Sequence, residues 1–245
     1  VSGRYVYTAH YEGKFNVTDV SNPASPVAIG SSVSLGQVNS AWDMAVSGNY
    51  VYIVKEGADK FVIMDVSNPA SPFIAGTLKT GSWPYRIVVS GKYAYYTDIG
   101  NDLLRIVDIS NPQNPFVIGS VTTGSSPRGL SVQGNYVYLV TATSNRLESY
   151  DVSDPQNPIQ RATVTTGLSP RDVKVIGRYA YVVNMTSNTL QIFNISNPTS
   201  IPVAVGSVST SNAPGRLAVT GRYAYVVTDS TTSFIDVFDI SNSSS

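Results

Sequence analysis

A unit of about 43 residues is repeated along the chain, and this repeat restricts the folds that the sequence can adopt. Each copy carries the pattern Val-x-Gly-x-Tyr, and the anchor valines lie 43 to 45 residues apart. Within each copy, four short alternating hydrophobic runs are separated by turn residues, which predicts a four-stranded antiparallel meander. We therefore expect an all-β fold, a β-propeller with about six four-stranded antiparallel blades. The anchors are Val1, Val46, Val89, Val132, Val175 and Val219.

The copy that contains residues 169–198 is the clearest. Its four expected strands are residues 172–175, 179–183, 189–195 and 203–208, which we name A, B, C and D. Strand B begins with Tyr-(Ala/Val)-Tyr in every copy. Because residues two apart share a sheet face, we expect these rings to pack between blades, with an aromatic ligand platform as the alternative. The tyrosines are Tyr5, Tyr7, Tyr50, Tyr52, Tyr93, Tyr95, Tyr136, Tyr138, Tyr179, Tyr181, Tyr223 and Tyr225.

An Asp-(Val/Ile)-Ser-Asn-Pro motif follows strand C in most copies. Asn and Ser bond to the local backbone and Pro fixes φ, so the motif predicts a rigid turn between strands C and D. We expect its first residue to cap this turn rather than to join a ring of carboxylates, because one copy has an asparagine there. The column contains Asp19, Asp65, Asp108, Asp151, Asn194 and Asp239.

The repeated motifs also carry a resemblance to a known family. Gly-x-Tyr-Ala-Tyr-Val followed by Leu-x-Ile-x-Asp-Ile-Ser-Asn-Pro resembles the LVIVD repeat family of β-propellers, and residues 104–108 read Leu-Arg-Ile-Val-Asp. The resemblance covers nearly the whole chain. It implies a propeller of the kind found mostly in bacterial and archaeal secreted or surface-anchored proteins, and it brings no catalytic residues.

The end copies are expected to be incomplete. Residues 1–240 read as a single propeller domain whose first copy lacks strand A and whose last copy, residues 213–240, lacks strand D. We expect a six-bladed ring closed by a D strand from upstream sequence, with five complete blades or seven as alternatives. A neighbouring chain is another possible donor of the strand, which would be self-assembly through blade edges. Residues 241–245 read as a Ser-rich linker or tail.

Composition excludes several classes of function. Lys plus Arg and Asp plus Glu are both 16, so the chain has zero net charge and no overall positive field that would attract nucleic acid. There is no cysteine, which excludes disulfides and a thiol nucleophile. No apolar run is long enough for a membrane helix, so we expect no direct membrane insertion. The low share of charged residues, 13%, favours an extracellular or cell-surface protein.

One rim of the propeller differs from copy to copy. The A–B and C–D turns are nearly uniform, whereas the B–C loops and D–A junctions vary, and variable loops are where binding residues are usually found. Residues 35–43 form the longest of these junctions and are the best candidate for a specialised element. The candidate ligand- or partner-binding residues at this rim are Trp42, Asp43, Trp83, Tyr85, Arg86, Arg128, Arg171, Asp172 and Arg216. Aromatics beside arginines suit a carbohydrate, a carboxylate or a protein partner, and the alternative is that these arginines only pair with nearby carboxylates.

Few groups suit catalysis or metal binding. His10 is the only histidine, so no catalytic triad based on histidine can be built. Asp98, Asn101 and Asp102 are weak candidates for a Ca²⁺ site, because they lack the spacing of a known calcium loop. No other cofactor is expected. Sequons for N-glycosylation begin at Asn16, Asn184, Asn194 and Asn242.

These observations favour a non-enzymatic extracellular or cell-surface propeller that acts in adhesion or as an interaction scaffold through its variable rim. Its expected partner is a protein or a carbohydrate. One alternative is a structural subunit of a surface layer, sheath or filament. The other is an enzyme, a hydrolase or lyase with a carboxylate or metal site in the propeller channel.

Overall fold

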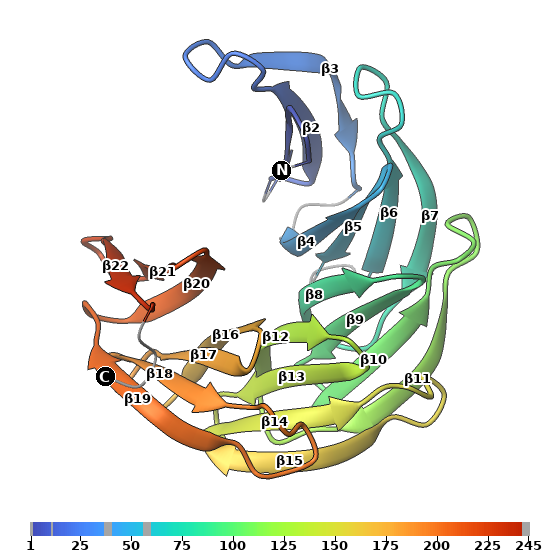
Figure 1. Ribbon diagram of the computed structural model, residues 1–245. Helices are drawn as coiled ribbons and strands as arrows, with labels where there is room; N and C mark the ends of the chain where they lie inside the picture. Colours follow the sequence, from blue (N-terminus) through green and yellow to red (C-terminus); the bar gives the residue numbers. More distant parts are fainter. Residues whose placement is uncertain (1, 11, 37–40, 56–59, 242–245) are drawn as a thin grey trace. The chain divides into compact units, whose positions relative to one another are not determined.

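The computed structural model describes residues 2–10, 12–36, 41–55 and 60–241. Within these residues the chain contains strands and turns and no helix, and it forms six antiparallel sheets in sequence order (Figure 1). Each sheet corresponds to one copy of the repeat. The all-β propeller fold expected from the repeat is therefore confirmed.

Four sheets contain all four strands in the order A, B, C, D. The second sheet contains β4 (Ala41–Ser47), β5 (Tyr50–Lys55), β6 (Lys60–Asp65) and β7 (Phe73–Lys79). The third contains β8 (Pro84–Ser90), β9 (Tyr93–Asp98), β10 (Leu103–Asp108) and β11 (Phe116–Thr122). The fourth contains β12 (Pro127–Gln133), β13 (Tyr136–Thr141), β14 (Arg146–Asp151) and β15 (Ile159–Thr165). The fifth contains β16 (Pro170–Ile176), β17 (Tyr179–Asn184), β18 (Thr189–Asn194) and β19 (Val203–Ser209).

The first and last sheets have three strands each in the described part of the chain. The first consists of strands B, C and D, which are β1 (Tyr5–Ala9), β2 (Lys14–Asp19) and β3 (Val27–Ser34). The last consists of strands A, B and C, which are β20 (Pro214–Thr220), β21 (Tyr223–Thr228) and β22 (Ile235–Asp239). In the described residues the first copy has no strand A and the last copy has no strand D, as the sequence pattern predicts. The expected tail at residues 242–245 lies outside the described residues.

The sheets belong to two compact units, residues 1–101 with 105–118, and residues 102–104 with 119–245. Each unit has hydrophobic clusters built by neighbouring sheets. In the first unit, Tyr7 is buried with Val51 and Ile53 of the second sheet. In the second unit, Tyr181 is buried with Leu217 of the last sheet. The second tyrosine of the strand-B pair is buried in the first five sheets, as expected, and burying such a side chain stabilises the fold by about 2 kcal/mol. Tyr225 of the last sheet is half-buried, and the first tyrosine of each pair is half-buried or, at Tyr223, exposed.

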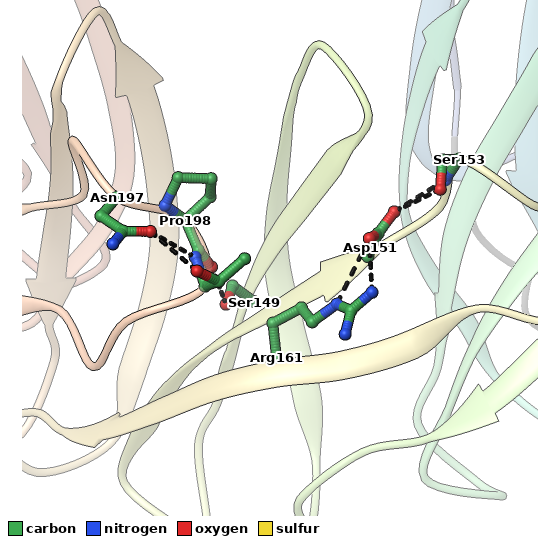
Figure 2. A network of polar contacts seen from close by, with 7 residues as sticks. Ser149, Asp151, Ser153, Arg161, Asn197 and Pro198 are labelled. Atoms are coloured by element: carbon green, nitrogen blue, oxygen red, sulfur yellow. Dashed lines mark hydrogen bonds and ion pairs between the residues drawn. The ribbon is translucent and has the colours of Figure 1, made fainter.

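The turn after strand C is built as predicted, and Figure 2 shows it in the fourth sheet. The carboxylate of Asp151 accepts hydrogen bonds from the backbone N–H (3.0 Å) and the hydroxyl (2.7 Å) of Ser153, and from Arg161 (2.8 Å). The Ser153 bonds, with help from Arg161, lower the pKa of Asp151 to about 2. The equivalent bond to the backbone N–H two residues later is made by Asp19, Asp65, Asp108, Asn194 and Asp239.

Besides the hydrophobic clusters, these turns also make contacts between neighbouring sheets of a unit. Figure 2 shows Ser149 of the fourth sheet beside Pro198 in the C–D turn of the fifth, and the Ser149 hydroxyl donates a hydrogen bond to the Pro198 carbonyl at 3.3 Å. At Gly119, on strand D of the third sheet, an added Cβ would collide with the carbonyl oxygen of Pro155 in the next C–D turn. A glycine on strand D thus lets the following turn approach closely.

No helix long and apolar enough to cross a membrane occurs in the part of the chain that the structure describes.

Candidate binding site at the start of the A strands

The B–C and D–A loops lie at the same end of each sheet. In the third sheet the N–H groups of Ile99 and Gly100 donate to the carbonyls of Trp83 (3.1 Å) and Ser82 (3.0 Å). In the fifth sheet Met185 donates to the carbonyl of Ser169 at 2.9 Å. In the third and fifth sheets the two variable kinds of loop therefore form one continuous rim, as the alternation of strands predicts.

A left-handed residue stands directly before strand A in four sheets. The φ angles are 61° at Trp83, 61° at Ser126, 55° at Ser169 and 54° at Ala213. A side chain with a Cβ in this region costs about 1 kcal/mol relative to ordinary backbone. Three of the four positions hold small residues, whereas Trp83 carries a large ring that is 55% exposed. The scaffold requires the backbone conformation there but does not require a tryptophan.

A second tryptophan lies close to the strand that Trp83 precedes. Trp42 on β4 is 39% exposed and packs against Tyr85 on β8, with ring centroids 5.1 Å apart and planes at 44°. The guanidinium of Arg86 lies 5.5 Å from the centre of the Tyr85 ring. We call Trp42, Trp83 and Tyr85 the aromatic face. It belongs entirely to the first unit.

The two aspartates expected at this rim serve the backbone. Asp43 on β4 accepts a hydrogen bond from the N–H of Ile87 on β8 at 3.0 Å, and its other oxygen lies 3.9 Å from the guanidinium of the buried Arg86. Asp172 on β16 is buried and accepts from the N–H of Leu217 on β20 at 3.1 Å. Each carboxylate ties one A strand to the next, a role that the sequence analysis did not predict.

The remaining predicted arginines belong to the second unit. Arg128 and Arg171 are half-buried and Arg216 is exposed. The Nε of Arg171 donates to the sulfur of Met185 at 3.1 Å. The structure thus places Tyr85 against both Trp42 and Arg86, and Trp83 precedes the same strand in the same unit, whereas the three arginines are part of the other unit.

The proposed calcium ligands are engaged in other bonds. Asp98 is buried, and its carboxylate accepts from Nε of Arg105 at 2.7 Å and from the side-chain amide of Asn101 at 3.0 Å. Asp102 accepts from the backbone N–H of Ser126 at 2.7 Å. Among the described residues, no three His, Asp or Glu side chains lie close enough to hold a metal ion. The calcium site stays a prediction, and the bonds of Asp98 give it no support.

A column of buried polar residues at the end of strand B was not identified from the sequence. Each copy contributes the residue five positions after the first tyrosine of strand B. Where this residue has a polar side-chain partner, the partner lies on strand C. Asp98 pairs with Arg105, and Asn184 donates to Gln191 at 3.0 Å. The same spacing that reveals the tyrosine column would have revealed it. The buried members are Lys55, Asp98, Thr141, Asn184 and Thr228.

The strand-C partners hold the D–A junctions in place. Gln191 accepts from the N–H of Gly167 at 2.8 Å, and Glu148 accepts from the N–H of Gly124 at 3.1 Å. In the third sheet a Cβ on Gly81 would collide with the carboxylate of Asp98. These polar residues therefore set the position of the loop that leads into strand A of the third, fourth and fifth sheets.

Two further ionisable groups are buried near this rim. The Nζ of Lys55 donates to the carbonyl of Leu35 at 2.8 Å, and burial lowers the pKa of this amine. The hydroxyl of Tyr150 donates to Glu148 at 2.7 Å, and burial together with the adjacent carboxylate raises the pKa of Tyr150. Residues 37–40 of the long junction at residues 35–43, the candidate for a specialised element, lie outside the described residues.

The structure describes the contacts of the sole histidine and of several of the sequon asparagines. The ring Nε2 of His10 lies 2.8 Å from the side-chain amide nitrogen of Asn16. Asn184 is fully buried, so its amide is not accessible to a glycan in the folded protein. Asn194 caps its C–D turn. Asn242 lies outside the described residues.

Comparison with known proteins agrees with this architecture. The LVIVD repeat family model matches residues 1–33, 39–80, 85–123, 125–166, 169–210 and 214–245. The chain belongs to the LVIVD repeat family. No curated protein matches this member of the family.

Solved structures resemble this LVIVD repeat protein in fold alone. A functionally unknown protein from Desulfotomaculum acetoxidans has a TM-score of 0.81 at 16% identity, over 97% of this chain and 75% of that one. A protein from Lactobacillus plantarum has a TM-score of 0.77 at 14% identity, over 96% and 80%. The periplasmic gluconolactonase of Pseudomonas aeruginosa has a TM-score of 0.70 at 18% identity, over 87% and 69%.

Proposed function

We propose that this LVIVD repeat protein is a non-enzymatic extracellular or cell-surface binding module, acting in adhesion or as an interaction scaffold. Its binding surface is the aromatic face of Trp42, Trp83 and Tyr85. The observation that carries this proposal is Trp83, a large ring that is 55% exposed at a left-handed backbone position. The left-handed backbone recurs in four sheets and belongs to the scaffold, whereas the exposed tryptophan occurs in the third sheet alone of these four, and exposed aromatic rings are typical of binding surfaces.

The surroundings of Trp83 support the same role. Trp42 and Tyr85 form a tilted pair with 5.1 Å between ring centroids, and the buried Arg86 beneath them faces Asp43. Aromatic rings bury large area with little loss of conformational freedom, which suits them to a sugar ring or a protein partner. The name gluconolactonase on one structural neighbour does not extend an activity to this chain, because 18% identity concerns the fold.

A carbohydrate is the first partner class to test. The chain has only two tryptophans, and both lie on the aromatic face, so intrinsic tryptophan fluorescence reports on this site alone. We expect wild-type protein to bind members of a glycan microarray, and each soluble hit to shift the tryptophan emission. Binding should be lost in Trp83→Ser, which installs the residue found at the equivalent positions 126 and 169.

A matched control is Phe116→Ser, because Phe116 is 52% exposed and lies away from the aromatic face on strand D. This variant should keep every hit. Glycan binding that survives Trp83→Ser would contradict the assignment of the site. An array without hits would exclude the glycans printed on it and leave a protein partner to be sought with the same pair of variants.

A second candidate function is a structural subunit of a surface layer, sheath or filament. It is favoured by an apolar residue that is more than half exposed at the start of strand D in five sheets. Because this column recurs at a fixed place on the outer strands, it offers regular contacts to neighbouring copies. Concentration-dependent sedimentation that disappears in a Phe73→Ser/Phe116→Ser variant would support it. The column contains Val27, Phe73, Phe116, Ile159 and Val203.

A further inference from the structure

A pocket lies between the first and second sheets, next to the turns that follow strand C in both. Its volume is about 650 Å³, within the range of about 300–1,000 Å³ that is usual for ligand pockets. Both sheets belong to the first unit, and the pocket shares no lining residue with the aromatic face. It is therefore a second ligand-sized site on this unit.

Part of the pocket lining is aliphatic. It comes from Val27 and Ile29 of β3 and from Pro69 and Ala70 in the C–D turn of the second sheet. Gly30 has a φ of 66°, and a Cβ at this position would collide with the carbonyl oxygen of Ala70. The glycine therefore lets the turn of the second sheet approach β3, so that aliphatic groups of both sheets border one space.

The fourth sheet shows why this space is open in the first. The third residue of strand D is Arg161 in the fourth sheet and Ile29 in the first. Arg161 reaches back to Asp151, and its Nε and Nη2 lie 3.2 and 2.8 Å from the carboxylate (Figure 2). Ile29 has neither the length nor the charge to do this, so the space in front of Asp19 stays open in the first sheet.

The first sheet places a different cation beside its aspartate. Arg4 precedes β1, and its Nε lies 3.4 Å from Oδ2 of Asp19 and donates a hydrogen bond to the Tyr5 hydroxyl at 2.9 Å. The Arg4 side chain is 61% exposed, and no described residue accepts a hydrogen bond from its Nη groups. The two Nη groups of a guanidinium form a fork that binds a carboxylate in bidentate geometry. Arg4 therefore offers this fork to a ligand in the pocket.

Further hydrogen-bond donors line the pocket. The Oδ1 atoms of Asn22 and Asn68 accept hydrogen bonds from the backbone N–H groups two residues later, at 3.2 Å in both turns. Because each amide oxygen is directed to its own turn, the NH₂ group is the part that remains for a ligand. The Tyr5 hydroxyl accepts from Arg4 and keeps its own proton to donate. The pocket thus combines a cation and neutral donors with an aliphatic lining.

The strand that the first copy lacks is not part of these walls. In the complete sheets strand A pairs with strand B, on the side away from strands C and D. Tyr5 is half-buried, as are Tyr50 and Tyr136 in complete sheets, and Asp19 is half-buried, as is Asp151. The exposure of these pocket residues is therefore that of the repeat.

We propose that this pocket binds a small organic carboxylate with an aliphatic body. The guanidinium of Arg4 and the NH₂ groups of Asn22 and Asn68 hold the carboxylate, and the body packs against Val27 and Ile29. Binding depends on both parts of the ligand. An alcohol has no charge to pair with Arg4, and acetate has little apolar surface to bury.

The test titrates the full chain with hexanoate, acetate and hexanol and follows two-dimensional amide NMR spectra. We expect hexanoate to shift the side-chain amide signals of Asn22 and Asn68 in a saturable manner, and to bind at least tenfold more tightly than acetate or hexanol. Equal binding of acetate would show that the aliphatic lining contributes nothing, and equal binding of hexanol would show the same of the donors. Either result, or no binding of hexanoate, would overturn the proposal.

Tryptophan emission separates this site from the aromatic face. Trp42 and Trp83 lie outside the pocket, so hexanoate should leave the emission unchanged. A change in emission without shifts at Asn22 and Asn68 would place the hexanoate on the aromatic face and would overturn the proposal. Loss of glycan binding in Trp83→Ser has no bearing on this pocket, so the two proposals can fail separately.

Variants locate the site independently. Arg4→Gln removes the fork from an exposed position and should weaken hexanoate binding at least tenfold. Arg178→Gln is the matched control, because Arg178 lies 5.1 Å from the ring of Tyr179, as Arg4 does from Tyr5, but belongs to the fifth sheet. It should bind hexanoate as the wild type does.

A third variant closes the pocket with a residue that the repeat already uses. Ile29→Arg gives the first sheet the strand-D arginine of the fourth, which should pair with Asp19, fill the pocket and abolish hexanoate binding. Wild-type affinity in Arg4→Gln or in Ile29→Arg, or an equal loss in Arg178→Gln, would show that hexanoate binds elsewhere and that the proposal is wrong.

Discussion

The third sheet and the fifth sheet enter strand A with the same backbone but with different side chains. Trp83 and Ser169 both have positive φ and both accept a hydrogen bond from the B–C turn of their own sheet. Behind them, the buried Asp98 of the third sheet forms an ion pair with the partly buried Arg105, whereas the buried Asn184 of the fifth forms a neutral pair with the partly buried Gln191. The repeat therefore requires a left-handed residue and a satisfied polar pair, and it leaves the chemistry of both positions open to variation.

The largest effect is expected from breaking the ion pair of the third sheet. Asp98→Ala removes the buried acceptor of Arg105 and Asn101, and an unsatisfied charge in this place costs far more than the pair contributes. We expect the free energy of unfolding to fall by about 3 kcal/mol. Urea unfolding followed by circular dichroism measures it.

The fifth sheet supplies the control for this experiment. The double variant Asp98→Asn/Arg105→Gln installs the pair that Asn184 and Gln191 already form, and it should recover most of the lost stability. If the double variant is as unstable as Asp98→Ala, the two sheets are not interchangeable at this position and the comparison fails.

The next effect concerns the aspartates that join A strands. Asp172→Ala leaves the backbone N–H of Leu217 without its acceptor in a buried setting, at a cost of about 2 kcal/mol. Asp43→Ala should cost about half as much, because the Asp43 side chain is 25% exposed and water can replace it. Both values come from urea unfolding. Asp172→Asn keeps an oxygen acceptor and should lie near wild type, and a loss as large as that of Asp172→Ala would point to the negative charge instead.

The repeat made the strands predictable because each structural requirement recurs six times. Strands A and B of the fifth sheet were expected at residues 172–175 and 179–183 and are found at Pro170–Ile176 and Tyr179–Asn184. The turn caps were predictable for the same reason, since Asn194 shows that an acceptor is needed there and a charge is not.

The details of the site were less predictable because they depend on contacts between copies. Trp42 and Tyr85 are 43 positions apart, and only the packing of β4 on β8 makes them neighbours. The bond from Ile87 to Asp43 depends on the register of two strands that share no ladder. The left-handed backbone at Trp83 could not be predicted because the position holds neither Gly nor Asn, the residues that usually adopt this conformation. Asn184 reads as a sequon, and only its burial shows that it belongs to the core.

A smaller effect distinguishes the fourth sheet from the fifth at the C–D turn. The folded-state pKa of Asp151 is lowered to about 2, so this carboxylate stabilises the fold above its unfolded pKa near 4 and loses that contribution as the pH falls towards 2. Asp151→Asn copies Asn194 and should flatten the decline in stability between pH 4 and pH 2. Thermal melting at several pH values measures it, and an unchanged slope would show that other carboxylates dominate acid unfolding.

The smallest effect on stability is expected at Trp83, the position that we propose for binding. Trp83→Ser gives the third sheet the residue that the fifth sheet has at position 169, and the left-handed backbone is common to both. Because the Trp83 side chain is 55% exposed, its loss should change the free energy of unfolding by no more than about 0.5 kcal/mol. The reverse exchange, Ser169→Trp, should fold as well but should not gain the ligand, since no Trp42–Tyr85 pair accompanies it in the second unit. A loss above about 1.5 kcal/mol in Trp83→Ser would identify this ring as part of the core, in the range of buried large-to-small substitutions, and would remove the reason for assigning it to binding.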